Sequence, residues 1–292
     1  MKKFHFNELL AQSWKWTKKN LSLWWLGLFV GLGSLVFDFR STDIQDAFTQ
    51  VFNDSGVDGL KNFLSNVGNA SMLVFWLGVI FIILSIIGIL ARAGLICGVK
   101  KIKDGEQYRL RDLAEFGVLK IPRLLLLEII LGIPFYILLI PVVVYVKFIA
   151  SQILFALFAI CLAGLIAYSV FLALFKHYAY CYAILDDQTA WNAIISGIKL
   201  LKQNFWNFVV VKLIQAGLWI VAALAMSVAV VVAMLPVLLI GILLSFVAGS
   251  FGSAAMAALS GVIGIAAVLA FRAGMNVFFA GYLTGAYWEA RE

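Results

Sequence analysis

Charged residues are scarce in this chain, and their scarcity decides its class. Only 13% of its 292 residues are charged, whereas 64% are hydrophobic and the mean hydropathy is +1.02. Soluble globular proteins carry about 25% charged residues, so this composition excludes that class. The sequence therefore predicts an integral membrane protein.

Residues that carry out chemistry are scarce as well. The chain has two histidines, His5 and His177, and three cysteines, Cys97, Cys161 and Cys181, without paired or metal-type spacing. It contains no His-Glu-x-x-His motif, no phosphate-binding glycine-rich loop and no serine-elbow pattern. We therefore expect no metal site, no cofactor and no catalytic group, and we expect the cysteines to be reduced packing residues.

Long runs with few or no charges recur along the chain, and each is a candidate transmembrane helix. Crossing about 30 Å of hydrocarbon takes about 20 helical residues. The sequence predicts one all-α, polytopic membrane helix bundle with six transmembrane helices, although the first run is short. The apolar segment 237–248 either lengthens the fifth helix or is re-entrant. The six predicted spans are residues 21–37, 71–99, 124–146, 148–175, 206–235 and 253–285.

The placement of basic residues predicts the orientation of these helices. Lysine and arginine are retained on the cytoplasmic side of a membrane. With a cytoplasmic N-terminus, most basic residues fall in cytoplasmic segments, and only Arg40, Lys61 and Lys147 fall outside. We therefore predict that both termini are cytoplasmic. The net charge of +7 follows from this bias and suits anionic lipid, so it gives no reason to expect nucleic acid.

Two similar segments precede predicted transmembrane helices. Residues 13–25, SWKWTKKNLSLWW, align with residues 196–209, SGIKLLKQNFWNFV, and both read as helices with an apolar face and a basic face. Tryptophans favour the headgroup layer, and lysines favour an anionic leaflet. A weaker third version starts at Asp112 and is interrupted by Pro122. We predict interfacial amphipathic helices whose membrane-interface residues are Trp14, Lys15, Lys18, Lys19, Lys199 and Lys202.

Each amphipathic segment is followed by two predicted spans. The chain thus reads as three units of an interfacial helix and a transmembrane hairpin, residues 4–99, 108–178 and 187–292. The run ARAGLICG from residue 91 also resembles FRAGMNVF from residue 271. These matches favour an internal repeat, and chance similarity between apolar segments is the alternative.

The run CYAILDDQTAWNAIISGIKLLKQNFWNFV, residues 181–209, resembles the membrane domain of bacterial glycerophosphoryl diester phosphodiesterases. Related six-helix proteins of unknown function share the aromatic, Ser-Trp, basic and Asn opening of residues 4–25. The resemblance covers most of the chain and implies a multi-pass protein of the prokaryotic plasma (inner) membrane, without an assigned activity. That family carries its chemistry in a separate soluble domain, which has no counterpart in this sequence, so the resemblance implies no catalysis here.

Four ionisable residues fall inside the predicted spans, where a charge is costly and usually faces the bundle interior or water. Arg92, Glu128 and Lys212 lie near cytoplasmic boundaries, about 7 to 12 Å inside them at 1.5 Å per helical residue. Arg272 reaches the same level if the sixth helix begins near residue 254. We predict that the four form a cytoplasm-facing cluster for a lipid phosphate or another anion. The alternative is that the basic side chains snorkel outward and that Glu128 forms an ordinary ion pair.

Glycines four residues apart predict close contacts between helices. Such contacts serve packing within the chain, and a homodimer seam is the alternative. The candidate pairs are Gly27 with Gly31, Gly94 with Gly98, and Gly281 with Gly285.

Residues 38–70 form the one sizeable segment predicted outside the cytoplasm. Their apolar positions favour two short amphipathic helices separated at the sequence NDSG. Such a segment covers the bundle or contacts a partner, and resting on the membrane surface is the alternative.

Two classes of function fit this sequence. The leading one is a non-enzymatic membrane component that interacts with anionic lipids, or that acts as an accessory or scaffold within a homo-oligomer or beside a membrane protein partner. The alternative is a transporter or permease for a small, anionic or lipidic substrate, because repeated hairpins often surround a central site. The predicted charges lie near one edge rather than at the midplane, which favours the first class.

Overall fold

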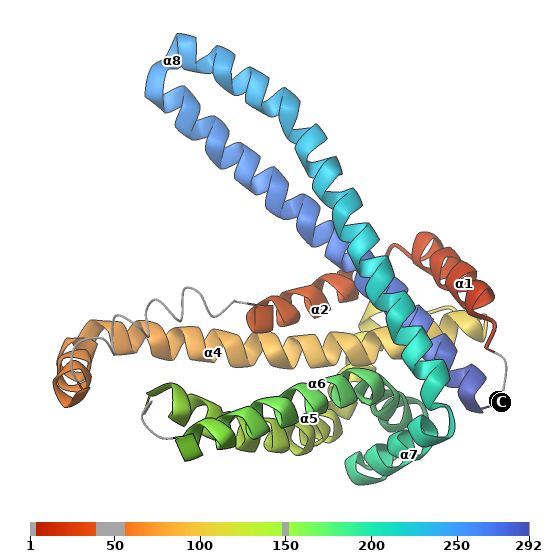
Figure 1. The fold of residues 1–292 in the computed structure, drawn as a ribbon. Coiled ribbons are helices and arrows are strands. Elements are labelled where there is room, and N and C mark those ends of the chain that lie inside the picture. The colour runs from red at the N-terminus through yellow and green to blue at the C-terminus, as the bar shows by residue number, and fades with distance from the viewer. Residues whose placement is uncertain (1–3, 39–55, 148–151, 292) are drawn as a thin grey trace.

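A computed structural model describes residues 4–38, 56–147 and 152–291 of the chain, and within these ranges the regular structure is entirely α-helical. Figure 1 shows the longest helix, α8, reversing its direction along its length. The helices are α1 (Phe6–Lys19), α2 (Leu23–Asp38), α4 (Gly56–Lys103), α5 (Leu110–Lys147), α6 (Gln152–Leu185), α7 (Ala190–Gln203) and α8 (Phe205–Arg291).

Within the residues that the structure describes, five helical segments are long and apolar enough to cross a membrane, which fits the predicted multi-pass membrane protein. The first predicted span, 21–37, corresponds to α2, which has only 16 residues. Six spans therefore remain a prediction. The segment 237–248 is part of α8. The five segments are Gly78–Lys103, Leu110–Pro141, Phe158–Leu185, Phe205–Val232 and Ile263–Arg291.

One expected helix break is absent. The amphipathic segment beginning at Asp112 is continuous with the apolar helix that follows it, because α5 runs through Pro122 to Lys147. A proline removes only one backbone N–H donor from a helix. Packing against the neighbouring helices α4 and α6 therefore suffices to keep α5 continuous. Of the predicted segment 38–70, residues 39–55 lie outside the described ranges, and residues 56–70 are the beginning of α4.

The best-buried region is the base, by which we mean α1, α7 and the parts of α4, α5, α6 and α8 beside them. Its core is rich in aromatic side chains, among which the rings of Tyr178 and Phe208 are tilted against each other with centroids 4.1 Å apart. Away from the base, apolar side chains such as Ile160 and Val228 are mostly exposed. Helices surrounded by lipid tails have this pattern, since lipid replaces protein as the apolar neighbour.

The helices that lead away from the base fall into two groups. The long parts of α4, α5 and α6 run together, whereas the two arms of α8 leave the base in another direction (Figure 1). Helix α2 lies against both groups, because it packs on α4 and on α8. The two groups therefore meet at the base and diverge beyond it.

The three segments predicted to be amphipathic each pack on another helix in the base. Helix α1 packs on α8, the first turns of α5 pack on α4, and α7 packs on α6. The helices contacted by α5 and α7 each belong to the predicted unit that comes before in the chain. The helix contacted by α1, in the first predicted unit, belongs to the last one. This cyclic arrangement joins the beginning of the chain to its end.

Small residues allow these three contacts to be close. A Cβ placed on Gly281 of α8 would lie 3.5 Å from the Ser13 Cβ of α1, and one on Gly197 of α7 would lie 3.3 Å from the backbone nitrogen of Ala179 in α6. One on Gly98 of α4 would lie 3.1 Å from Leu113 Cδ1 of α5. Helix backbones approach closely where side chains are this small.

The glycines singled out in the sequence all lie against other helices of the same chain. A Cβ on Gly94 would lie 3.1 Å from Leu26 in α2, and one on Gly285 would lie 2.8 Å from Leu9 in α1. A Cβ on Gly31 would lie 3.2 Å from Asn276 Nδ2 in α8. These faces are covered by the chain itself, so they are not available as a homodimer seam.

The closest of these contacts joins α2 to α8 at Gly27. A Cβ on Gly27 would lie 2.3 Å from the carbonyl oxygen of Ala273, which is far inside van der Waals contact. The Asn276 amide also donates a hydrogen bond of 3.0 Å to the Gly27 carbonyl oxygen. A side chain at this position therefore has to move backbone, which a packed interior resists.

We predict that Gly27→Ala destabilises the protein by about 1–3 kcal/mol, the usual cost of overpacking. The control is Gly217→Ala on the exposed surface of α8, where a Cβ meets nothing within 4 Å. Thermal unfolding in detergent should show a lower midpoint for Gly27→Ala and an unchanged or higher one for Gly217→Ala. Equal midpoints for the two variants would contradict the close contact between α2 and α8.

Candidate functional site

Glu128 of α5 lies at the centre of the charged residues inside the bundle. Its carboxylate oxygens lie 2.6 Å from Lys176 Nζ on α6 and 3.8 Å from Arg92 Nη1 on α4. The Tyr180 hydroxyl, one helical turn after Lys176, donates a hydrogen bond to the same carboxylate. The Arg92 guanidinium also lies 5.5 Å from the centroid of the Tyr180 ring, within cation–π range. One carboxylate thus balances two cations drawn from two other helices.

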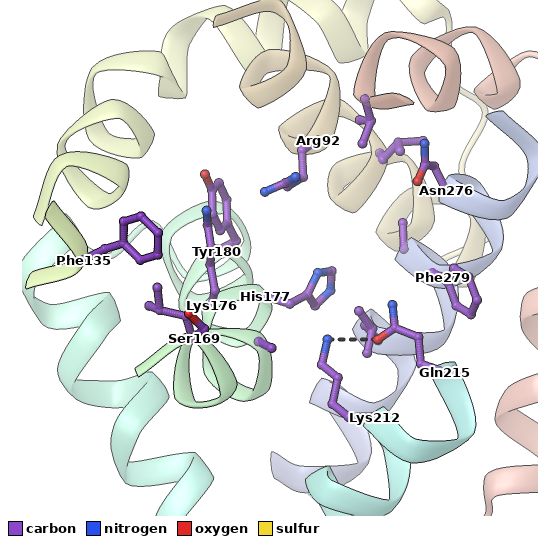
Figure 2. A pocket seen from close by; sticks show the side chains of 16 residues that line it. Arg92, Phe135, Ser169, Lys176, His177, Tyr180, Lys212, Gln215, Asn276 and Phe279 are labelled. Atoms are coloured by element: carbon purple, nitrogen blue, oxygen red, sulfur yellow. Dashed lines mark hydrogen bonds between the residues drawn. The ribbon is translucent and has the colours of Figure 1, made fainter. Parts of the chain in front are cut away.

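A cavity of about 470 Å³ opens beside this group, where the arms of α8 begin to diverge from α4–α6. Its lining comes from α2, α4, α5, α6 and both arms of α8. Figure 2 shows Arg92, Lys176 and Lys212 around this space on three helices, with the His177 imidazole between Lys212 and the other two. We call this space the cationic cavity.

Lys212 brings a third positive charge to the cationic cavity. Its Nζ donates a hydrogen bond of 2.9 Å to Gln215 Oε1, an uncharged acceptor one turn further along α8 (Figure 2). Within the described residues, no carboxylate forms an ion pair with Lys212. Among the described residues that line the two adjoining spaces, Glu128 is the one acidic residue beside three cations, so the site carries an excess of positive charge.

Further polar groups complete the lining. The imidazole of His177 enters the cavity next to Lys212, and its Nε2 lies 3.3 Å from the Thr284 hydroxyl of α8. The side chains of Ser169 and Asn276 also line the cavity. An anion bound between the cations would therefore have further hydrogen-bonding groups around it.

A second, more apolar cavity of about 580 Å³ lies alongside the first, between α4 and α5. The two share five lining residues, so they are adjoining parts of one hollow. Glu128 lines only the second, and Lys212 lines only the first. The shared residues are Val30, Arg92, Phe135, Leu172 and Lys176.

The structure brings together three of the four charged residues predicted from the sequence. Arg272, the fourth, does not line either cavity. It lies one turn of α8 before Asn276 and alongside α2, where its Cβ is 3.7 Å from a Cβ placed on Gly31. The predicted cluster placed Arg272 by its depth along the helix alone. Because α8 diverges from α4–α6, equal depth along two helices does not bring their side chains together (Figure 1).

Sequence reasoning missed Lys176, which takes the place expected for Arg272. The fourth predicted span ends at residue 175, which puts Lys176 in the cytoplasm, but α6 continues to Leu185. Lys176, His177 and Tyr180 then fall within one turn inside the helix. Their close spacing near the end of an apolar run was the signal that could have identified them.

The predicted membrane-interface residues lie on the surface of the base. Trp14 is 53% exposed, and the ammonium group of Lys18 lies 5.1 Å from the centroid of its ring. Lys15, Lys19, Lys199 and Lys202 are exposed as well. Their contact with a membrane remains a prediction.

The connection between α6 and α7 ties the walls of the cationic cavity together at the base. Asp186 accepts hydrogen bonds from Tyr287 and Arg291 at the end of α8, at 3.0 and 2.8 Å. Asp187 instead pairs with Lys120 and Arg123 of α5. Its φ of 56° is a left-handed conformation, which aspartate and asparagine tolerate better than most residues. Two adjacent carboxylates thus bind two different helices.

The chain matches no protein-family model, no curated protein and no solved structure. The resemblance to the phosphodiesterase membrane domain therefore remains a prediction from the sequence.

We predict that Asp187→Asn loosens the base while keeping its backbone. Hydrogen bonds from Lys120 and Arg123 hold the pKa of Asp187 below its usual value. A lowered folded-state pKa gives stability that is present at neutral pH and is lost as the pH falls through that pKa. The melting midpoint of the variant should be lower than that of the wild type at pH 7, and the difference should shrink in acid.

The matched control for this prediction is Asp104→Asn, on the exposed turn after α4. It should leave the midpoint unchanged at both pH values. A difference between Asp187→Asn and the wild type that is the same at pH 7 and in acid would show that the ion pairs do not stabilise the base.

Proposed function

We propose that this protein is a non-enzymatic component of the prokaryotic plasma membrane that binds the anionic group of a membrane lipid in the cationic cavity. The observation that carries the proposal is the charge imbalance, with Arg92, Lys176 and Lys212 beside the single carboxylate of Glu128. Charges inside an apolar bundle are costly unless they are compensated, and a phosphate supplies the missing negative charge.

The proposed orientation places the base at the cytoplasmic surface, with both termini in the cytoplasm and six spans arranged as three hairpins. It is supported by the exposed lysines of α1 and α7, because an anionic inner leaflet attracts basic side chains. It is supported too by the lysines near the end of α4, Lys100, Lys101 and Lys103. In this orientation the cationic cavity faces the leaflet that is rich in anionic lipid.

An accessory or scaffold role is compatible with lipid binding and belongs to the same proposal. A partner, whether a second copy or another membrane protein, would then contact surfaces other than the glycine faces, which this chain covers itself. The predicted resemblance to membrane domains without chemistry of their own supports the same role.

The alternative is a transporter or permease for an anionic or lipidic substrate. One observation favours it: the cationic cavity is lined by both arms of α8 as well as by α4, α5 and α6, and α8 diverges from those helices (Figure 1). A movement of α8 relative to the other group would change access to the cavity. Flux of anionic lipid or small anions through protein-containing vesicles would support this alternative.

We predict that Arg92→Gln and Lys212→Gln each reduce the retention of anionic phospholipid by about tenfold or more, since a hydrogen bond to a charged group contributes about 1.5–3 kcal/mol. Native mass spectrometry of protein extracted gently from its own membrane measures the bound lipid. Lys199→Gln, on the exposed face of α7, removes the same charge outside the cavity and should retain the lipid. Unchanged retention in both cavity variants would refute the proposal.

The opposite change is expected for Glu128→Gln. The carboxylate competes with an incoming phosphate for Arg92 and Lys176, whereas glutamine keeps the shape and can still accept a hydrogen bond from Tyr180. Retention of anionic phospholipid should therefore rise, by about tenfold. A fall in retention would mean that Glu128 positions the two cations for the ligand instead of competing with it.

A further inference from the structure

One of the two adjoining cavities is charged and the other is mostly apolar, as are the headgroup and the acyl chains of a phospholipid. The cationic cavity holds the charged side chains, while the second cavity continues from Arg92, Glu128 and Lys176 along α4 and α5. Beyond those charged residues, its lining is apolar apart from Ser85 and the hydroxyl of Tyr136. We call this second cavity the chain groove.

The length and direction of the chain groove suit an acyl chain. Its lining runs from Glu128 to Tyr136 along α5, and from Arg92 back to Ser85 along α4. At 1.5 Å per residue these stretches are about 12 Å and about 10 Å long. Both lead away from the base, because α4 enters the base and α5 leaves it. The hydrocarbon layer of a bilayer is about 30 Å thick. Starting from its charged end, the groove is thus long enough to cover most of one leaflet's half of that layer.

The chain groove is open to the side. Ile129, Ile133 and Tyr136 on its rim are 58%, 50% and 62% exposed. They lie on a part of α5 that is long and apolar enough to span a membrane, where lipid tails are the neighbours. A lipid can therefore enter from the bilayer without moving its tail through water.

We propose that the ligand is a phospholipid whose phosphate lies between Arg92, Lys176 and Lys212 while one of its acyl chains lies in the chain groove. This inference rests on the proposed function and names the class of its ligand. Lipid tails are as apolar in the bilayer as in the groove, so the groove contributes orientation and chain selectivity more than affinity. The protein then distinguishes a long-chain phospholipid from a short-chain one with the same headgroup.

The test compares dioleoyl and dihexanoyl phosphatidylglycerol, which share a headgroup and differ in chain length, added to purified full-length protein and measured by native mass spectrometry. Gly132 lines the groove, and a Cβ there meets only the ring of Tyr136, at 3.4 Å. Gly132→Leu should weaken binding of the dioleoyl lipid by about fivefold, because the leucine overlaps the chain, and leave the dihexanoyl lipid unchanged.

Gly164→Leu on α6 is the matched control, because a Cβ there meets only Leu138, at 3.5 Å, and Gly164 lines neither cavity. It should bind both lipids as the wild type does. Ile133→Trp, which narrows the rim of the groove, is a second variant. It should weaken the binding of the dioleoyl lipid and leave that of the dihexanoyl lipid unchanged.

The outcomes separate this inference from the proposed function. Arg92→Gln could weaken the binding of both lipids while Gly132→Leu and Ile133→Trp weaken the binding of neither. In that case the chain groove is not used and the headgroup site stands. Equal weakening of both lipids by the two groove variants also overturns the inference, because the groove then does not discriminate chains. If Arg92→Gln weakens neither lipid, the proposed function fails and the inference fails with it.

Discussion

The arrangement of this site depends on one carboxylate that serves more cations than it can neutralise. Glu128 binds Lys176 and Arg92 and accepts a hydrogen bond from Tyr180, which joins α5 to α6 and α4 inside an apolar bundle. A buried charge is tolerated only when it is paired and hydrogen-bonded. Lys212 stands on the other side of the cationic cavity with an amide as its partner. The bundle therefore holds a charge imbalance that a bound anion would remove.

The base holds this site in place through contacts between segments that are distant in sequence. Helix α1 packs on α8, the beginning of α5 packs on α4, and α7 packs on α6, so that the two ends of the chain meet in the base. Asp186 and Asp187 add polar links from the α6–α7 connection to α8 and to α5. The walls of the cationic cavity are thus fixed at one end, while α8 diverges from α4–α6 beyond it (Figure 1).

Composition and charge spacing were enough to predict the class of this fold. Low charge and long apolar runs predicted a helical membrane protein, and five helical segments in the described part of the chain have the required length. The interruption expected at Pro122 was wrong, because α5 continues through this proline and packs on α4 and α6. Spacing along single helices brought Arg92, Glu128 and Lys212 to one site. It failed for Arg272 and Lys176, because those positions depend on the tilt of α8 and the true end of α6, which no local pattern encodes.

An experimental structure of the protein in nanodiscs of anionic phospholipid would show whether the cationic cavity holds a lipid phosphate. We expect density for a phosphate within hydrogen-bonding distance of Arg92, Lys176 and Lys212, with the Glu128 carboxylate still beside the bound group. A cationic cavity filled only by water, with ordered lipid confined to the outer surfaces of the helices, would contradict it. In that case Arg92 and Lys176 would be structural partners of Glu128, and the function would have to be sought elsewhere on the molecule.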